Sequence, residues 1–384
     1  MAKKLLALLV LAALAGLATA QDPIRIGINL ELSGRFATIG NATLQGIQAA
    51  QEQMPTVNGS TVELSICDNQ TTPEGSINCA ARFVDEGVIG VLGAISSTMS
   101  IAAAEPLEDA GIIMISTSST NPATTQIGEH IFRMAYTDDF QGRVAARYAA
   151  NDLGAERAIV FRQQDDDYSF GLAGFFAEEF EALGGEAIVL DYVSNTVDFS
   201  AQINDARGFD ADVIYYSGFC AEGASLMPQL RQQGFDQQIL GADASDDSQC
   251  PVGGGEAFDE YVFTGFGGPE VLSGAAAERA TEFAAFFDVV FPDASDFNGF
   301  TLAGADSYNV LVQAVANAGS DDPDEVLTAL QNLEGYAGVS GEITYAGTDG
   351  TPADRTIGFF RYSVPGEDGS EWSSQSLFGL GTGE

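Results

Sequence analysis

Two clusters of small hydroxyl side chains are the most informative chemical feature of the sequence. Ser96, Ser97 and Thr98 follow the apolar run VIGVLGAI, and the stretch STSST at 116–120 follows the apolar run GIIMI. Small hydroxyl residues let a ligand approach the free N–H groups at the start of a helix, and they add donors of their own. Such a site suits a carboxylate. Helix capping and loop chemistry remain the alternative, because Ser and Thr are common in both roles.

Two further side chains sit where a strand meets the following segment. Tyr168 lies in DDDYSFGLAG at 165–174, at a strand-to-helix turn, where it either covers a pocket or simply packs. Asp243 directly follows the run QQIL, in GADASDDSQC. Two interpretations of Asp243 are open: a counter-ion for a ligand's ammonium group, or one more exposed carboxylate.

Catalysis and metal binding find little support. The only histidine is His130, and no nucleophile elbow accompanies it. The loop LSGRFATIG at 32–40 lacks the GxGxxG and GxxxxGK[ST] spacings of phosphate-binding loops. The cysteine spacing does not fit zinc, and the acidic run at 241–250 does not follow the calcium-loop pattern. We therefore expect no catalytic residue, no metal and no cofactor.

The elements that must position these residues alternate between short apolar runs and helix-length amphipathic segments. Two such series run from about 24 to 134 and from about 139 to 265. Near-continuous apolar strands separated by helices predict an α/β protein with parallel sheets covered on both faces. One sheet holding every strand would be unusually wide, so we predict two lobes with a first crossing near 133–142. Near the C-terminus, SGEITYAG and RTIGFFRYS look like hairpin strands.

The N-terminus predicts export. MAKKLLALLVLAALAGLATAQD has a lysine-bearing start, an apolar stretch and a small-residue site for cleavage after Ala20. The apolar stretch is too short for a typical membrane span. Residues 1–20 are therefore expected to be a signal peptide of a periplasmic protein. The 364 residues that remain (384 minus 20) favour two domains.

The charge of the chain excludes two classes of partner. Both lysines lie in the predicted signal peptide, which leaves 13 Arg against 55 Asp and Glu, a net charge of −42 (13 minus 55). Such a field repels nucleic acid and anionic membranes. Because salt screens the self-repulsion, we interpret the composition as a halophilic adaptation.

Four cysteines in an exported chain predict disulfides. Local pairing of Cys67 with Cys79 and of Cys220 with Cys250 is the simplest of three possible connectivities.

Taken together, these segments resemble the periplasmic solute-binding proteins of ABC transporters for branched-chain amino acids, the Leu/Ile/Val-binding family. The resemblance runs from about Ile24 to past Arg361 and rests on the order of IRIGINLELSGRFATIG, GAISST, EDAGIIMISTSST, FQG, DDDYSFGLAG and DVIYYSGF. It implies a type I periplasmic binding protein fold, with two doubly wound parallel-sheet lobes joined by three crossings. Lobe I would hold 21–138 plus 268–344, and lobe II 139–267 plus 345–384.

The resemblance also implies a ligand site. The positions that match ligand-binding positions of the family are Ser97, Ser118, Thr120, Tyr168, Asp243, Phe219, Ile95 and Ser96. The first three would grip an α-carboxylate and ammonium, Tyr168 would be an aromatic lid, and Asp243 would meet the ammonium. Phe219 matches an aromatic of the second lobe, and Ile95 and Ser96 would line the pocket.

Three positions depart from the family pattern. Asp243 stands where the family usually has the longer Glu, Ile39 where an aromatic is frequent, and Ser118 where Ala is frequent. These changes predict a pocket that is more polar near Ser118 and aliphatic near Ile39.

The expected function is that of an extracytoplasmic, non-enzymatic and monomeric binding protein. It would capture an amino acid, branched-chain or otherwise apolar, between two closing lobes and deliver it to membrane permease subunits. The alternatives are a binding protein for a small amide, urea or carboxylate, and a sensor subunit with the same fold. Two further alternatives are an exported hydrolase that uses Ser97 or Ser118, and an acidic structural exoprotein.

Overall fold

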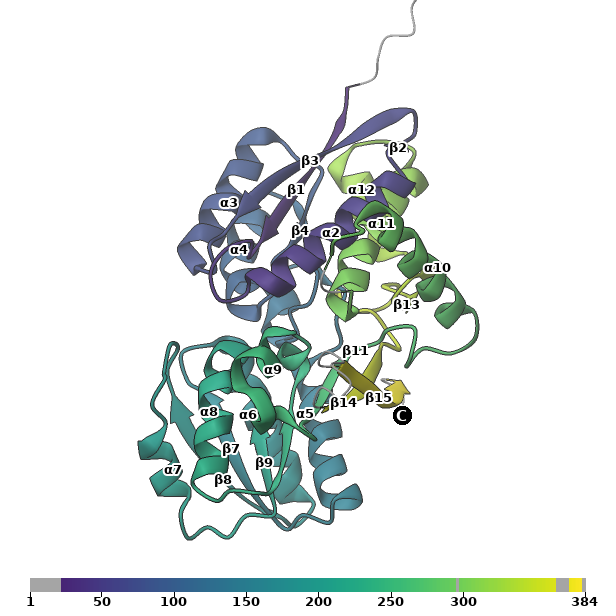
Figure 1. Ribbon diagram of the computed structural model, residues 1–384. Helices are drawn as coiled ribbons and strands as arrows, with labels where there is room; N and C mark the ends of the chain where they lie inside the picture. Colours follow the sequence, from purple (N-terminus) through teal and green to yellow (C-terminus); the bar gives the residue numbers. More distant parts are fainter. Residues whose placement is uncertain (1–21, 295–296, 364–372, 382–384) are drawn as a thin grey trace, which may run out of the picture.

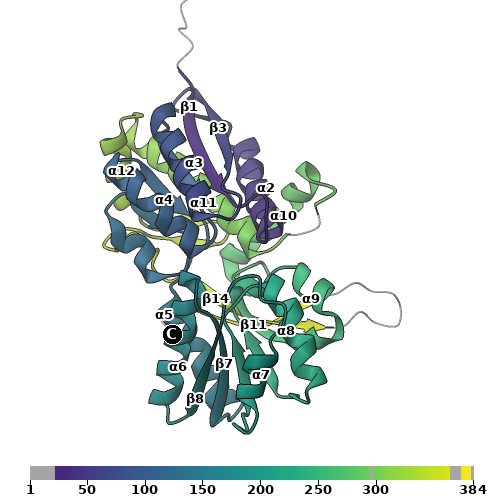
Figure 2. The same ribbon diagram turned by 90° about the vertical axis from the view of Figure 1, so that its left-hand side faces the viewer.

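The protein consists of two lobes, each built on one mostly parallel sheet. The computed structural model describes residues 22–294, 297–363 and 373–381. Figures 1 and 2 show the lobes one above the other, in views 90° apart. The chain passes between the two sheets three times, after residues 133, 266 and 343. The predicted α/β class is confirmed. The predicted signal peptide lies outside the described residues, and the predicted lobe boundaries stay a prediction.

Lobe I contains a six-stranded sheet of order β2-β3-β1-β4-β5-β6. The β2–β3 pair is antiparallel and the other pairs are parallel. The strands are β1 (Ile24–Leu30), β2 (Thr56–Val57), β3 (Ser60–Asp68), β4 (Gly90–Gly93), β5 (Ile113–Ser116) and β6 (Ile131–Arg133). Strands β4 and β5 are buried along their whole length, which accounts for their unbroken apolar runs.

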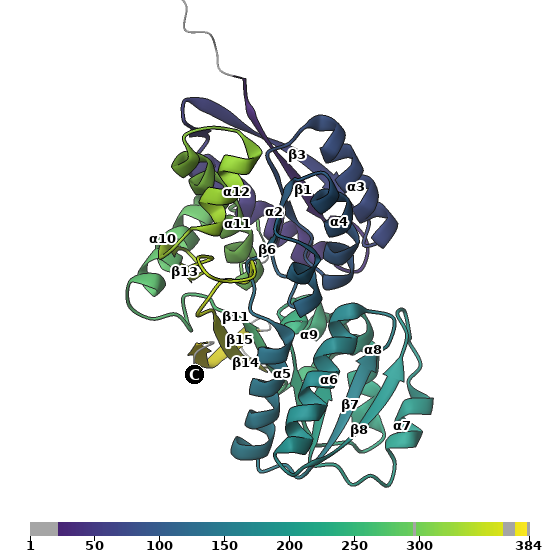
Figure 3. The same cartoon turned by 180° about the vertical axis from the view of Figure 1, so that it is seen from behind.

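The helices of lobe I cover both faces of this sheet (Figure 3). They are α2 (Ala37–Gln53), α3 (Pro73–Glu86), α4 (Ser97–Asp109), η1 (Pro122–Ile127), α10 (Gly274–Val290), α11 (Gly299–Ala318) and α12 (Pro323–Gln331). A short hairpin, β12 (Tyr336–Gly338) with β13 (Gly341–Ile343), follows them and accounts for part of the predicted SGEITYAG strand.

Lobe II contains a seven-stranded sheet of order β15-β14-β11-β10-β9-β7-β8. Its strands are β7 (Arg157–Gln163), β8 (Glu186–Tyr192), β9 (Val213–Tyr216), β10 (Gln238–Gly241), β11 (Val262–Phe266), β14 (Thr356–Ser363) and β15 (Ser373–Gly381). Its helices are α5 (Asp138–Arg147), η2 (Tyr148–Asp152), α6 (Asp167–Ala182), α7 (Ser200–Ala206), α8 (Cys220–Gln232), η3 (Asp243–Ser245), α9 (Gln249–Gly254) and η4 (Gly255–Phe258).

The sheet of lobe II is mixed, whereas the sequence predicts a parallel one. Strand β14 is antiparallel to both β11 and β15. A parallel neighbour needs a crossover connection within the same sheet. Here the chain enters β14 directly from lobe I, and β15 then follows β14 as its antiparallel partner.

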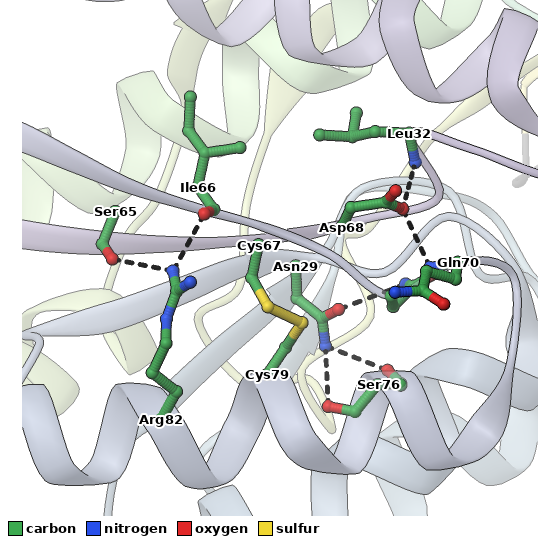
Figure 4. Close-up of a disulfide and its surroundings, with 12 residues drawn as sticks. Asn29, Leu32, Ser65, Ile66, Cys67, Asp68, Gln70, Ser76, Cys79 and Arg82 are labelled. Carbon is green, nitrogen blue, oxygen red and sulfur yellow. Dashed lines mark hydrogen bonds between the residues drawn. A yellow bond between two sulfur atoms is a disulfide. The ribbon is translucent and has the colours of Figure 1, made fainter.

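Both disulfides expected from local pairing are present, Cys67–Cys79 and Cys220–Cys250. Figure 4 shows the first, which joins the end of β3 to α3. Beside it, the Asn29 amide donates to the Ser76 hydroxyl at 2.9 Å. This end of the lobe I sheet is therefore tied to its covering helix by both a covalent and a polar link.

Helices α2 and α11 lie side by side in lobe I (Figures 1 and 3). Their backbones meet at two glycines. A Cβ atom on Gly46 would lie 2.0 Å from the carbonyl oxygen of Thr301, and one on Gly304 would lie 2.4 Å from that of Thr43. Glycine is required here because no side chain fits between the helices.

We predict that Gly46→Ala destabilises the protein by about 1–3 kcal/mol, because the added methyl group forces the two helices apart. Urea unfolding followed by circular dichroism measures the change. Gly174→Ala in α6 is the matched control. It has open space around the new Cβ and should stabilise the protein by about 0.5–1 kcal/mol. A Gly46→Ala variant as stable as the wild type contradicts the close crossing.

Candidate functional site

A narrow cavity lies where the strand ends of lobe I face the helix starts of lobe II. The lining residues are Phe36, Ile39, Ile95, Ser96, Ser97, Ser118, Thr120, Tyr168, Phe219, Asp243, Ala244 and Phe300. All eight residues predicted for ligand binding are among them, and all eight are buried. Their role in binding stays a prediction.

The first hydroxyl cluster forms the start of α4. Ser96 is the N-cap residue, and its hydroxyl accepts a hydrogen bond from the Met99 N–H at 3.4 Å. The helix begins at Ser97 itself. Ser96 therefore caps the helix, and Ser96 and Ser97 both line the cavity.

The Ser97 hydroxyl is oriented as a donor to the cavity. Its oxygen accepts hydrogen bonds from the Asn121 N–H at 3.2 Å and from the Ser119 hydroxyl at 3.1 Å. A hydroxyl has one hydrogen and two lone pairs. Because both lone pairs are engaged by the protein, the hydrogen remains available to an acceptor in the cavity.

Glu31, which the sequence did not single out, occupies part of this helix start. The side chain is fully buried, and its carboxylate accepts from the N–H groups of Ile95 and Ser96, at 3.1 Å each. Burial raises the pKa of Glu31, and the hydrogen bonds from the two N–H groups lower it. Glu31 therefore fixes the turn before α4, and these two N–H groups are not available to a ligand.

The second cluster contributes residues with different hydrogen-bonding roles. The Ser118 hydroxyl donates to the carbonyl oxygen of Ile95 at 3.3 Å, so its lone pairs are left to accept. The Thr120 hydroxyl is buried and faces the Asp138 carboxyl group. Arg133, fully buried beneath the cluster, donates to the carbonyl oxygen of Ser119 at 3.0 Å and holds the loop.

Asp243 faces these hydroxyls from lobe II. Its Oδ1 accepts from the Gln141 amide at 2.7 Å and from the Tyr168 hydroxyl at 2.8 Å. Burial raises the pKa of Asp243 to about 6, although both hydrogen bonds lower it. A carboxylate desolvated in this way attracts a cation.

A second buried carboxylate, Asp138, lies nearby at the start of α5. Burial and the charge of Asp243 both raise the pKa of Asp138, whereas the Thr120 hydroxyl and the charge of Arg133 lower it. Asp138 does not line the cavity, so it acts on the site through its charge and through Thr120.

The rest of the cavity wall is apolar. Rings of Phe36 and Phe219 lie 4.3 Å apart between their centroids, and Tyr168 packs on Phe219 at 5.4 Å. Ile39 and Phe300 extend this wall. Phe36 and Phe300 were missed by the sequence reasoning. Phe36 could have been predicted from its position in the loop between the first strand and the first helix.

Within the described residues, no three His, Cys, Asp or Glu side chains gather in a way that could hold a metal ion. None of the helices in the described ranges has the length and hydropathy needed to cross a bilayer.

A two-lobed α/β protein with a partly polar cavity between its lobes has the architecture of a solute-binding protein. A family model described as periplasmic binding protein matches residues 23–369, and the chain belongs to this family. The resemblance noted in the sequence is thereby confirmed. Proteins of this family are not enzymes. They act outside the cytoplasmic membrane as the solute-binding components of ABC transporters.

Individual relatives agree with this assignment. An amino acid binding protein of Pseudomonas aeruginosa is 30% identical over 317 residues, covering 80% of this chain and 82% of the relative. A Leu/Ile/Val-binding protein of Rhizobium johnstonii is 27% identical over 354 residues, covering 91% and 94%. The crystal structure of a leucine binding protein of Thermotoga maritima superposes with a TM-score of 0.86 at 31% identity, covering 93% of this chain and 98% of that chain. The type I fold is confirmed.

We predict that Asp243→Asn stabilises the ligand-free protein at pH 7. The folded pKa of about 6 lies above the ordinary value of 3.8, so the folded chain holds a proton that the unfolded chain releases between about pH 4 and 6. Ionised Asp243 therefore lowers stability above pH 6, by at most about 3 kcal/mol.

Urea unfolding at pH 7 and pH 4 tests this sign. The gain from Asp243→Asn should be present at pH 7 and vanish at pH 4, where the native carboxyl group is protonated in the folded state. Asparagine retains an oxygen to accept from Gln141 and Tyr168. If the variant is less stable than wild type at pH 7, burial of the ionised carboxylate does not lower the free energy of unfolding.

Proposed function

We propose that the protein captures a branched-chain or similarly sized apolar amino acid and presents it to the permease subunits of an ABC transporter. The observation that supports this most directly is the division of the cavity. Hydroxyl groups and a buried carboxylate lie at one end, and a wall of aromatic and aliphatic side chains lies at the other. A zwitterion with a short apolar side chain matches both ends.

The polar end fits the two charged groups of an amino acid. Ser97 has a hydrogen free to donate to the α-carboxylate, and the start of α4 adds a favourable dipole. Asp243 and the lone pairs of Ser118 fit the ammonium group, and the Thr120 hydroxyl of the second cluster also lines the cavity. The same buried carboxylate that disfavours the empty site would then gain a cation on binding.

The apolar end fits a side chain of a few carbon atoms. Ile39, Phe36 and Phe300 are among the apolar residues that line the cavity. Ile39 places aliphatic bulk where an aromatic is frequent in related proteins. Closing the lobes around such a ligand removes its apolar surface from water, at roughly 25 cal/mol per Å².

The relatives support this ligand class, since their names denote amino acid, Leu/Ile/Val and leucine binding. The proposal includes export by cleavage after Ala20, and the high negative charge fits a saline exterior.

A thermal-shift screen in high salt tests the ligand class. Leucine, isoleucine, valine, other amino acids, small amides, urea and aromatic carboxylates would each be added to the protein that starts at Gln21. A ligand at about 100 times its dissociation constant adds about 2.7 kcal/mol of stability. A response to leucine, isoleucine or valine supports the proposal. A response confined to amides, urea or aromatic carboxylates rejects the amino acid and leaves the family intact.

We predict that Ser97→Ala weakens binding of the responding amino acid by about 1.5–3 kcal/mol, through loss of a hydrogen bond to a charged group. Isothermal titration calorimetry measures the loss. Ser225→Ala, on α8 and away from the cavity, is the control and should bind like wild type. If Ser97→Ala binds with wild-type affinity, Ser97 does not contribute to ligand binding. Asp243→Asn should also weaken binding, although it stabilises the empty protein.

A further inference from the structure

Arg35 joins the two lobes beside the cavity. It lies in the loop between β1 and α2 of lobe I, and its guanidinium contacts three side chains of lobe II. Nη1 donates to the Gln163 amide oxygen at 3.1 Å and lies 3.3 Å from Oε1 of Glu222. Nη2 lies 3.8 Å from Oδ2 of Asp166. The arginine of one lobe thus meets two carboxylates of the other.

These groups are largely removed from water. The side chains of Asp166 and Glu222 are 2% and 1% exposed, and that of Arg35 is 18% exposed. The second carboxylate oxygen of Glu222 is buried and has no hydrogen-bond partner in the part of the chain that the structure describes. Truncating one member of such a pair is expensive, because the remaining charge stays buried. Both carboxylates also accept from backbone N–H groups, Asp166 from Ser169 at 3.1 Å and Glu222 from Asn195 at 2.8 Å, and Arg35 adds the positive charge from the other lobe.

The same guanidinium lies against the apolar wall of the cavity. Its central carbon is 4.5 Å from the ring centroid of Phe36 and 5.0 Å from that of Phe219. Both rings line the cavity, whereas Arg35 does not. Arg35 therefore acts on the site only through these rings and through the position of the lobes.

We propose that Arg35 is a closing latch, a positioning residue that stabilises the closed arrangement of the lobes without touching the ligand. A neighbouring polar contact supports this geometry, since the Thr98 hydroxyl of lobe I donates to Asp166 at 3.2 Å and accepts from the Asp167 N–H at 3.0 Å. Closing is a step shared by all ligands, so the latch raises every affinity by the same factor.

The first test uses the ligand-free protein and does not depend on the proposed function. Small-angle X-ray scattering compares wild type with Arg35→Gln. The variant should have the larger radius of gyration, because its lobes separate more often. Arg25→Gln is the matched control. It removes the same charge from lobe I, where Arg25 pairs with Glu63 at an exposed position within one sheet. Equal radii for wild type and Arg35→Gln overturn the latch.

The second test rests on the proposed function and uses leucine, isoleucine and valine as probes. Arg35→Gln should raise the dissociation constant at least ~10-fold, mainly through faster dissociation. The factor should agree among the probes within about twofold. Arg25→Gln should leave all values unchanged. An unchanged affinity, or a factor that differs strongly between probes, overturns the latch.

The two tests separate the possible failures. If wild type binds none of the three amino acids, the proposed ligand class fails and the scattering result alone decides the latch. If Arg35→Gln does not fold by circular dichroism, Glu222→Gln tests the same contact from lobe II, with the same expected direction. Wild-type behaviour of Glu222→Gln in both measurements then rejects the proposal.

Discussion

The structure depends on a carboxylate that is buried among neutral partners. Asp243 lies between the lobes, where the Gln141 amide, the Tyr168 hydroxyl and its own backbone N–H compensate its charge. Neutral donors offset part of the desolvation of an anion, and the remainder is left for a bound group to supply. A binding protein benefits from a buried charge that its own residues compensate only in part. A fully paired site would be more stable when empty and would gain less when a ligand arrives.

The hydroxyl clusters complement this carboxylate because of sheet geometry. Strands β4 and β5 are parallel neighbours, so the residues that follow them arrive at the same edge of the sheet. Two other residues of lobe I hold these polar segments in place. Glu31 fixes the turn before Ser96, and Arg133 holds the loop at Ser119. The protein thus uses two buried charged side chains to orient neutral groups, and it leaves the neutral groups to face the cavity.

The sequence predicted the α/β class, the local disulfide pairing and eight of the residues around the cavity. The class and the disulfide pairing follow from local signals, namely apolar runs and the spacing of cysteines. Local signals also pointed to the hydroxyl clusters, Tyr168 and Asp243, whereas the full set of eight came from the resemblance to the family. Glu31, Gln141 and Arg35 were not predicted, because their partners are 64 to 187 positions away along the chain. Such contacts depend on how elements are placed in three dimensions, and no local pattern in one sequence encodes that placement. Strand β14 was predicted as a hairpin-like strand, but its antiparallel pairing with β11 was not, because the chain reaches this position from the other lobe.

The close crossing of α2 and α11 has a consequence for the order in which the chain assembles. The sheet of lobe I is encoded by residue 133, but α11, which packs against α2, begins only at Gly299. The five parallel strands of lobe II, by contrast, are contiguous between residues 157 and 266. Lobe II can therefore form most of its core from an uninterrupted segment, whereas lobe I must hold an unprotected apolar face until the chain has returned to it. Long-range closure of this kind is slow, so we expect the completion of lobe I to be the slower step of assembly, during which its apolar face stays exposed.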